Sequence, residues 1–160
     1  MRGKIVEAEG AESLTLIRRL FAEYAASLEV DLAFQGFDEE LADLPGAYAR
    51  PAGILLLGLD GREPAGCVAF RPLEPGVVEM KRLYVRPAAR GAGWGRRLVE
   101  RAVDEARAAG YERMRLDTLP SMRAAIDLYA GMGFREIPAY RHNPVEGTRF
   151  LQLDLRSGQG

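Results

Sequence analysis

Residues 77–101, which read VVEMKRLYVRPAARGAGWGRRLVER, decide the fold. Residues 77–85 are rich in side chains that favour β-structure, and the run stops before Pro87, which favours a strand ending there. From Trp94 onward, apolar residues recur at helical spacing, which predicts a helix over residues 96–109. Glycines occupy the junction between strand and helix. Because glycine leaves backbone N–H groups open and the start of a helix favours an anion, the junction predicts a phosphate site.

Three phosphate-binding patterns compete for these glycines. The P-loop and the dinucleotide fingerprint both need a glycine where this chain has Arg96, so both fail. The pattern R/Q-x-x-G-x-G/A after a strand is met by Arg90, Gly93 and Gly95. Downstream, residues 125–134 read AIDLYAGMGF, which has the form A-x-x-L-Y-x-x-x-G-F. In this order and separation, the two motifs resemble the coenzyme A loop and the LYxxxGF helix of the GNAT family of N-acetyltransferases, in a bacterial-type single-domain form.

The resemblance implies an α+β (mixed α/β) fold. A central mixed, mostly antiparallel sheet of six to seven strands would be flanked by about four helices. We expect a single domain over residues 1–156, in keeping with the length of 160 residues, and a disordered tail over 157–160.

The resemblance also implies acetyl-CoA as co-substrate. Its pyrophosphate would lie on the Gly-rich turn, and main-chain groups of the preceding strand would hold the pantetheine arm. Many relatives have an asparagine where this chain has Met122, so Ser121 is the expected polar substitute. The expected cofactor-binding residues are Leu83, Tyr84, Val85, Arg90, Gly91, Ala92, Gly93, Trp94, Gly95, Arg96 and Ser121.

Tyr129 holds the position of the tyrosine that the resemblance assigns as the catalytic acid. A tyrosine, with a reference pKa near 10, can return a proton to a departing thiolate, whose pKa by analogy with cysteine is about 8.5. The alternative is an aromatic core residue at helical spacing with Ile126 and Met132.

Glu79 resembles the glutamate that some members use to deprotonate the amine through water. A carboxylate with an ordinary pKa near 4.3 is a weak base unless burial raises that pKa. The alternative is an ion pair with a nearby basic side chain such as Lys81 or Arg115. The resemblance leaves this open, because many relatives have no dedicated base and bind the neutral amine.

Acceptor specificity in the family comes from the N-terminal helices and the last loop. Aromatic residues beside the acids of residues 38–43 suit the amine of a small molecule or a peptide, although an acidic helix can also simply face solvent. His142 is the only histidine, and an exposed loop position is its alternative role. The expected acceptor contacts are Phe34, Phe37, Asp117, Tyr140, His142 and Asn143.

Composition and charge limit the kinds of partner and cofactor that the protein is expected to bind. The formal net charge is −1 and the sequence pI is about 5.9, which argues against nucleic acid, whereas the basic band of residues 81–101 suits a compact polyanion. Cys67 is the only cysteine, so no internal disulfide forms, and we expect a buried core residue rather than an acyl-carrying nucleophile. No cluster has metal-ligand spacing, so we expect no metal.

The location and assembly of the protein are also expectations. The N-terminus lacks the apolar core of a signal peptide, and the longest apolar run, residues 54–57, is too short to span a bilayer. We therefore expect a cytoplasmic protein without a membrane partner. Homodimerisation through the terminal strands is a hypothesis.

Two functions are compatible with these features. The first is an acetyl-CoA-dependent N-acetyltransferase that acts on a primary amine of a small molecule or peptide by direct transfer in a ternary complex. The second is a non-catalytic domain that binds or senses acyl-CoA.

Overall fold

The computed structural model describes residues 3–28 and 36–156. Its elements, in chain order, are β1 (Lys4–Glu7), α1 (Gly10–Ser27), α2 (Phe37–Asp43), η2 (Gly46–Tyr48), β2 (Ile54–Asp60), β3 (Glu63–Glu74), β4 (Val77–Val85), η3 (Pro87–Ala89), α3 (Trp94–Ala108), β5 (Arg113–Thr118), α4 (Arg123–Gly131), β6 (Arg135–Ile137) and β7 (Arg149–Asp154). The strands form one sheet in the order β1-β2-β3-β4-β5-β7-β6, with only β4 and β5 parallel among neighbours in the described part of the chain. The predicted α+β fold with a mixed, mostly antiparallel sheet is confirmed. The strand predicted over residues 77–85 matches β4, and the helix predicted from residue 96 begins two residues earlier.

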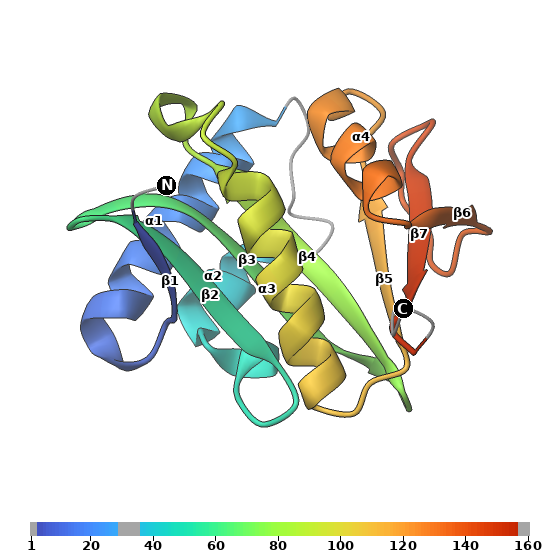
Figure 1. Cartoon of the computed structure of the whole chain (residues 1–160), viewed down its shortest axis with the longest axis horizontal. Coiled ribbons are helices and arrows are strands. Elements are labelled where there is room, and N and C mark those ends of the chain that lie inside the picture. Colours follow the sequence, from blue (N-terminus) through green and yellow to red (C-terminus); the bar gives the residue numbers. More distant parts are fainter. Residues whose placement is uncertain (1–2, 29–35, 157–160) are drawn as a thin grey trace.

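Helices cover both faces of the sheet (Figure 1). α3 packs on one face over side chains such as Val68, Val78 and Met114, and α4 adds Tyr129 to the same core. α1 and α2 cover the opposite face, where alternate residues of β2 and β3 form a second core. This two-sided burial follows from the alternation of side chains along each strand. No helix within the described residues is long and apolar enough to cross a membrane.

The start of α3 is fixed by Trp94. Its indole is 3% exposed and lies against Gly58 of β2, where an added Cβ would come within 2.9 Å of the ring. The guanidinium of Arg97 covers the ring, 4.6 Å from its centroid. The helix that follows the Gly-rich turn is therefore anchored to the sheet by its first residue.

The sheet divides between β4 and β5. These strands pair only over Val77–Arg113, Val78–Met114 and Glu79–Arg115. Beyond this point β4 continues with β3, while β5 continues with β7 as far as Thr118. Figure 1 shows β4 and β5 meeting at the lower right and diverging upward toward α4. The two half-sheets thus enclose a fork, in which neither strand has the other as a partner.

A bulge in β4 accompanies the fork. Cys67 of β3 pairs with Tyr84, and Ala69 pairs with Lys81, so Arg82 and Leu83 face a single residue of β3. Arg82 has φ 63, a left-handed conformation that costs a non-glycine residue on the order of 1–3 kcal/mol.

Contacts with α2 offset the strain at Arg82. Its guanidinium donates two hydrogen bonds to Glu40, at 2.9 and 3.0 Å, and stacks on Phe37 at 5.1 Å. α2 therefore holds the bulge that turns Leu83 and Val85 toward the core under α3.

Candidate functional site

The Gly-rich turn presents open backbone donors at the start of α3. Gly91 and Gly93 have φ of 85 and 84, and Gly93 is the N-cap residue without a side-chain cap. The first intrahelical bond runs from the N–H of Arg97 to the carbonyl of Gly93, so the N–H groups before Arg97 lack acceptors inside the helix. Arg90 secures the turn by donating to the Val85 carbonyl at 3.1 Å. Such a turn fits a phosphate group.

The predicted residues of the turn differ in which atoms they offer. Trp94 is buried, so only its main chain faces the turn, whereas Arg96 is exposed and pairs with Glu100 at 3.2 Å. Tyr84 lies on the opposite face of β4 from Leu83, where its hydroxyl donates to Glu23 at 3.3 Å. Leu83 and Val85 are half-buried on the face of α3 and α4.

A pocket fills the fork between β4 and β5, and we call it the fork pocket. It is lined by Tyr24, Leu28, Met80, Lys81, Arg82, Leu83, Leu116, Asp117, Thr118, Leu119, Met122, Tyr129 and Asn143. Met80, Leu83, Leu116 and Tyr129 belong to the core under α3 and α4, whereas Tyr24 and Leu28 belong to the core under α1. The fork pocket therefore receives side chains from both faces of the sheet.

Two hydroxyl-bearing residues lie on the α3/α4 side of the fork pocket. Tyr129 is 5% exposed, its ring lies 5.5 Å from that of Phe134, and burial raises its pKa well above the ordinary value of a tyrosine. Thr118 is 6% exposed, and its Oγ1 has no hydrogen-bond partner among the described residues. A buried hydroxyl without a partner lowers the free energy of unfolding by roughly 1–3 kcal/mol, so the Thr118 hydroxyl destabilises the protein in the absence of a ligand.

The charged residues that line the fork pocket are Lys81, Asp117 and Arg82, whose guanidinium binds Glu40 of α2. Lys81 is 7% exposed, and burial lowers its pKa to about 8, while attraction to Glu79 and Asp117 opposes this shift. Asp117 is half-buried on β5 and accepts a long hydrogen bond, 3.4 Å, from the Asn143 amide. The pocket thus joins a cation on β4 with an anion on β5.

Glu79 is fully buried at the closed end of the fork. Its carboxylate forms ion pairs with Arg71 at 3.2 Å and Arg141 at 2.7 Å, and it accepts a hydrogen bond from the Tyr140 hydroxyl at 2.8 Å. Burial would raise the pKa of Glu79, but Lys81 and these partners outweigh it, so the pKa lies below the ordinary value. A carboxylate held ionised by several donors is poorly suited to act as a base. Glu79 therefore forms ion pairs with nearby basic side chains, Arg71 and Arg141, as the alternative to a base role expected, whereas Arg115 pairs with Glu74.

The remaining predicted residues are dispersed. Phe34 lies outside the described residues, and Phe37 is buried beneath Arg82. His142 and Ser121 are exposed and are not among the residues that line the fork pocket, while Met122 is. Cys67 is buried, with its thiol donating to the Arg82 carbonyl at 3.4 Å and a pKa raised by burial.

Sequence reasoning missed Lys81 and Thr118 as pocket residues. Thr118 continues the alternation of the buried residues Met114 and Leu116 along β5. This pattern places a polar residue on a buried face, so the sequence could have predicted Thr118 as a candidate site residue. Lys81 gave no such signal, because a lysine in a strand usually reads as solvent-exposed. Within residues 3–28 and 36–156, no cluster of three or more potential ligands could hold a metal ion.

Comparisons with known proteins identify the family of the chain. The sequence model of the acetyltransferase (GNAT) family matches residues 17–134. A protein of Schizosaccharomyces pombe, described as an uncharacterized N-acetyltransferase, is 39% identical over 146 residues, covering 90% of each chain. An acyl-CoA N-acyltransferase structure from Klebsiella pneumoniae superposes with a TM-score of 0.73 at 26% identity, covering 96% of this chain and 97% of its own. An acetyltransferase of Salmonella typhimurium, solved with acetyl-CoA, shares the fold with a TM-score of 0.68 at 23% identity and coverage of 97% and 95%.

The Glu79 cluster makes a prediction about stability. We expect Glu79→Gln to lower the free energy of unfolding at neutral pH by about 2 kcal/mol, because it removes the charge that binds two guanidinium groups. The lowered pKa of Glu79 means that its stabilisation is complete above the ordinary value of 4.5 and is lost as the pH falls through the native value. Urea unfolding should therefore show the gap between wild type and variant closing at acidic pH.

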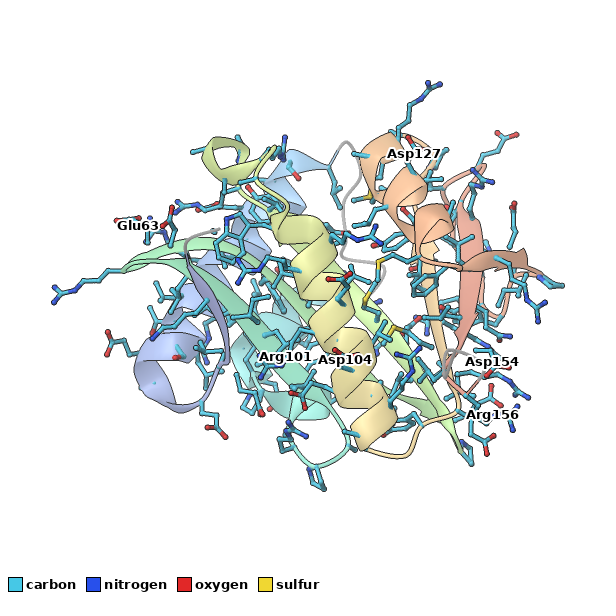
Figure 2. The ribbon with its side chains drawn as sticks, viewed as in Figure 1. Glu63, Arg101, Asp104, Asp127, Asp154 and Arg156 are labelled. Carbon is cyan, nitrogen blue, oxygen red and sulfur yellow. The ribbon has the colours of Figure 1, made fainter. Side chains whose placement is uncertain are left out.

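Glu63→Gln is the matched control for this measurement. Glu63 projects from the β2–β3 hairpin (Figure 2), its side chain is 80% exposed, and its ion pair with Arg86 is 3.9 Å long. Its change should stay below about 0.5 kcal/mol. Equal stability of the two variants would contradict the structural role of Glu79.

Proposed function

The chain belongs to the GNAT family of acetyltransferases, and we propose that it transfers the acetyl group of acetyl-CoA directly to a primary amine of a small molecule or peptide in a ternary complex. The observation that carries this proposal is the fork pocket, which is lined by side chains from both faces of the sheet and includes Leu83 of β4, the strand that precedes the Gly-rich turn. A donor can enter from the side of α3 and α4 and an acceptor from the side of α1, so that the two reactants meet between β4 and β5.

The proposed donor site combines the turn and β4. The N–H groups at the start of α3 would donate hydrogen bonds to the pyrophosphate, and the main chain of the half-buried residues Leu83 and Val85 would hold the pantetheine arm. The end of the pairing between β4 and β5 supports this role, because no β5 residue pairs with Leu83 or Val85.

The reaction exchanges one bond for another. Acetyl-CoA supplies the acetyl group as a thioester. The amine nitrogen bonds to the carbonyl carbon of the acetyl group as the carbon–sulfur bond breaks. One proton leaves the nitrogen, and one proton reaches the sulfur. We propose that Tyr129 donates that last proton; its raised pKa supports this role, because it keeps the hydroxyl protonated at neutral pH. The same burial would raise the pKa of a thiolate beside it. Thr118 would supply a second hydroxyl to the thioester arm.

On the acceptor side, Asp117 is better placed than Glu79 to bind the amine. Asp117 lines the fork pocket, and its charge acts on both Lys81 and Tyr129, whereas Glu79 is held by Arg71, Arg141 and Tyr140. We propose that Glu79 positions Tyr140 and Arg141, and that Asp117 orients the amine and receives or relays its proton.

Tyr129→Phe tests the reaction together with the acid. Thiol release from acetyl-CoA across a panel of amines should give turnover with wild type. The variant should lose kcat by roughly 100-fold, the usual contribution of a general acid, with coenzyme A affinity nearly unchanged by calorimetry.

Tyr111→Phe is the control, because the Tyr111 hydroxyl donates to the Ala52 carbonyl at 2.8 Å, away from the fork pocket. Weakened coenzyme A binding with normal kcat in Tyr129→Phe would reject the acid role. Binding of acetyl-CoA by wild type without turnover of any amine would favour a sensing domain instead.

Thr118→Val tests whether the unpartnered hydroxyl serves the thioester. Without ligand, the variant should be more stable than wild type by about 1 kcal/mol, because it removes a buried hydroxyl that has no partner within residues 3–28 and 36–156. Its kcat/KM for acetyl-CoA should fall roughly tenfold, the value of one hydrogen bond to the ligand. Thr118→Ser, which keeps the hydroxyl, should retain activity. A valine variant that is fully active would remove Thr118 from the site.

A further inference from the structure

A second pocket lies on the face of the sheet that α1 and α2 cover, and we call it the α2 pocket. It has a volume of about 330 Å³, within the range of sites that bind small organic molecules. Its lining comes from α2, from η2 and the turn before it, and from Arg71 of β3. The α2 pocket is therefore large enough to hold a functional group of an organic ligand.

Three acids of α2 line the α2 pocket. Glu39, Glu40 and Asp43 are spaced so that they share one side of the helix. Phe37 and the following Leu44 pack instead into the core under α1 and α2. Glu39 and Asp43 are exposed, and neither side chain forms an ion pair or a hydrogen bond with the residues that the structure describes. Two carboxylates without a counter-charge are thus gathered at this pocket.

The other charges of the α2 pocket are compensated. Glu40 accepts two hydrogen bonds from the Arg82 guanidinium, at 2.9 and 3.0 Å. Arg71 pairs with Glu79 at 3.2 Å. The two exposed carboxylates lie four residues apart on one helix, where like charges repel each other. A positively charged ligand group would relieve this repulsion and neutralise the pocket.

Tyr48 adds a buried hydroxyl to the α2 pocket. The residue is 2% exposed, its ring packs edge-on against Phe21, and its hydroxyl has no hydrogen-bond partner of ordinary geometry among the described residues. Burial and the nearby Glu40 carboxylate raise the pKa of this hydroxyl, and the charge of Arg71 also acts on it. Because Glu40 and Arg71 both line the α2 pocket, the hydroxyl lies at its floor, where its oxygen can accept a hydrogen bond from a ligand N–H group.

The α2 pocket and the fork pocket meet at one ion pair. Arg82 lines the fork pocket, and Glu40, which binds it, lines the α2 pocket. Asp117 of the fork pocket lies on this same face of the sheet, because its neighbour Leu116 belongs to the core on the opposite face. An extended ligand that passes along the Arg82–Glu40 pair would reach both pockets.

We propose that the acceptor is a small molecule with a second cationic group, and that the α2 pocket binds this group while the primary amine reacts in the fork pocket. This inference rests on the proposed function. Glu39 and Asp43 would pair with a distal ammonium or guanidinium, and the Tyr48 hydroxyl would accept one of its N–H groups. The amine that attacks the thioester must be neutral, so its own charge cannot hold it during the reaction. A distal cation stays charged throughout, which points to diamines and related polyamines.

Pairs of matched acceptors test the inference on the wild-type enzyme. Thiol release from acetyl-CoA would be compared between putrescine and butylamine and between cadaverine and pentylamine, because the members of each pair differ only in the second ammonium. We expect kcat/KM for each diamine to exceed that for its monoamine by at least about tenfold, the usual value of a charge-assisted hydrogen bond. This margin exceeds the statistical advantage of two equivalent amines. Agmatine, whose second group is a guanidinium, should show the same preference.

Variants at the α2 pocket locate the preference. Glu39→Gln and Asp43→Asn should each reduce the ratio of kcat/KM between diamine and monoamine by roughly fivefold, mainly by raising KM for the diamine. Tyr48→Phe, which removes only the hydroxyl, should reduce the same ratio. Asp38→Asn is the matched control, because Asp38 is an exposed acid of the same helix that does not line the α2 pocket. Its ratio should equal that of wild type.

The possible results separate the inference from the proposed function. Equal kcat/KM for diamines and monoamines in wild type would overturn the inference while the proposed acetyl transfer stands. The inference would also fail if Glu39→Gln and Asp43→Asn kept the full diamine preference, or lowered kcat/KM equally for both acceptors. Turnover confined to peptides, or to amines without a second positive charge, would overturn it likewise. Absence of thiol release with every amine would overturn both.

Discussion

The parting of β4 from β5 is the constraint on which the site depends. A continuous sheet would pair these strands along their length, and no ligand could pass between them. Here three residue pairs hold the strands together, after which β4 follows β3 and β5 follows β7. The bulge at Arg82 bends β4 at the point where it parts from β5. Arg82 adopts a strained left-handed conformation there, and its contacts with Glu40 and Phe37 of α2 offset this strain. Helix α2 therefore supports the site through Arg82, although none of its residues lines the fork pocket.

The two faces of the sheet bring different kinds of side chain to the fork pocket. Tyr129 and Thr118 reach the fork pocket from the core under α3 and α4. Burial there keeps the tyrosine protonated, and the threonine hydroxyl has no partner in the part of the chain that the structure describes. Lys81 and Asp117 reach it from the opposite face, close to the cluster in which Glu79 binds Arg71 and Arg141. The proposed reaction needs this separation, because proton donation to the departing sulfur and recognition of a charged acceptor favour different environments.

Local patterns predict much of the fold and little of the acceptor side. The strand and helix around the Gly-rich turn follow from residue preferences and spacing within residues 77–101, and the resemblance built on them places Tyr129 on a helix that faces the fork. The bulge at Arg82 is not predictable in this way, because a left-handed arginine depends on Glu40, far away in sequence. The environment of Glu79 depends likewise on Tyr140 and Arg141 from the connection between β6 and β7. Sequence separation, not residue type, limits the prediction.

A crystal structure of the protein with acetyl-CoA would test the central claim most directly. The account predicts that the pyrophosphate contacts the N–H groups at the start of α3, and that the thioester lies in the fork pocket within hydrogen-bond distance of the hydroxyls of Tyr129 and Thr118. A pantetheine arm that runs outside the fork, with the thioester away from both hydroxyls, would contradict it.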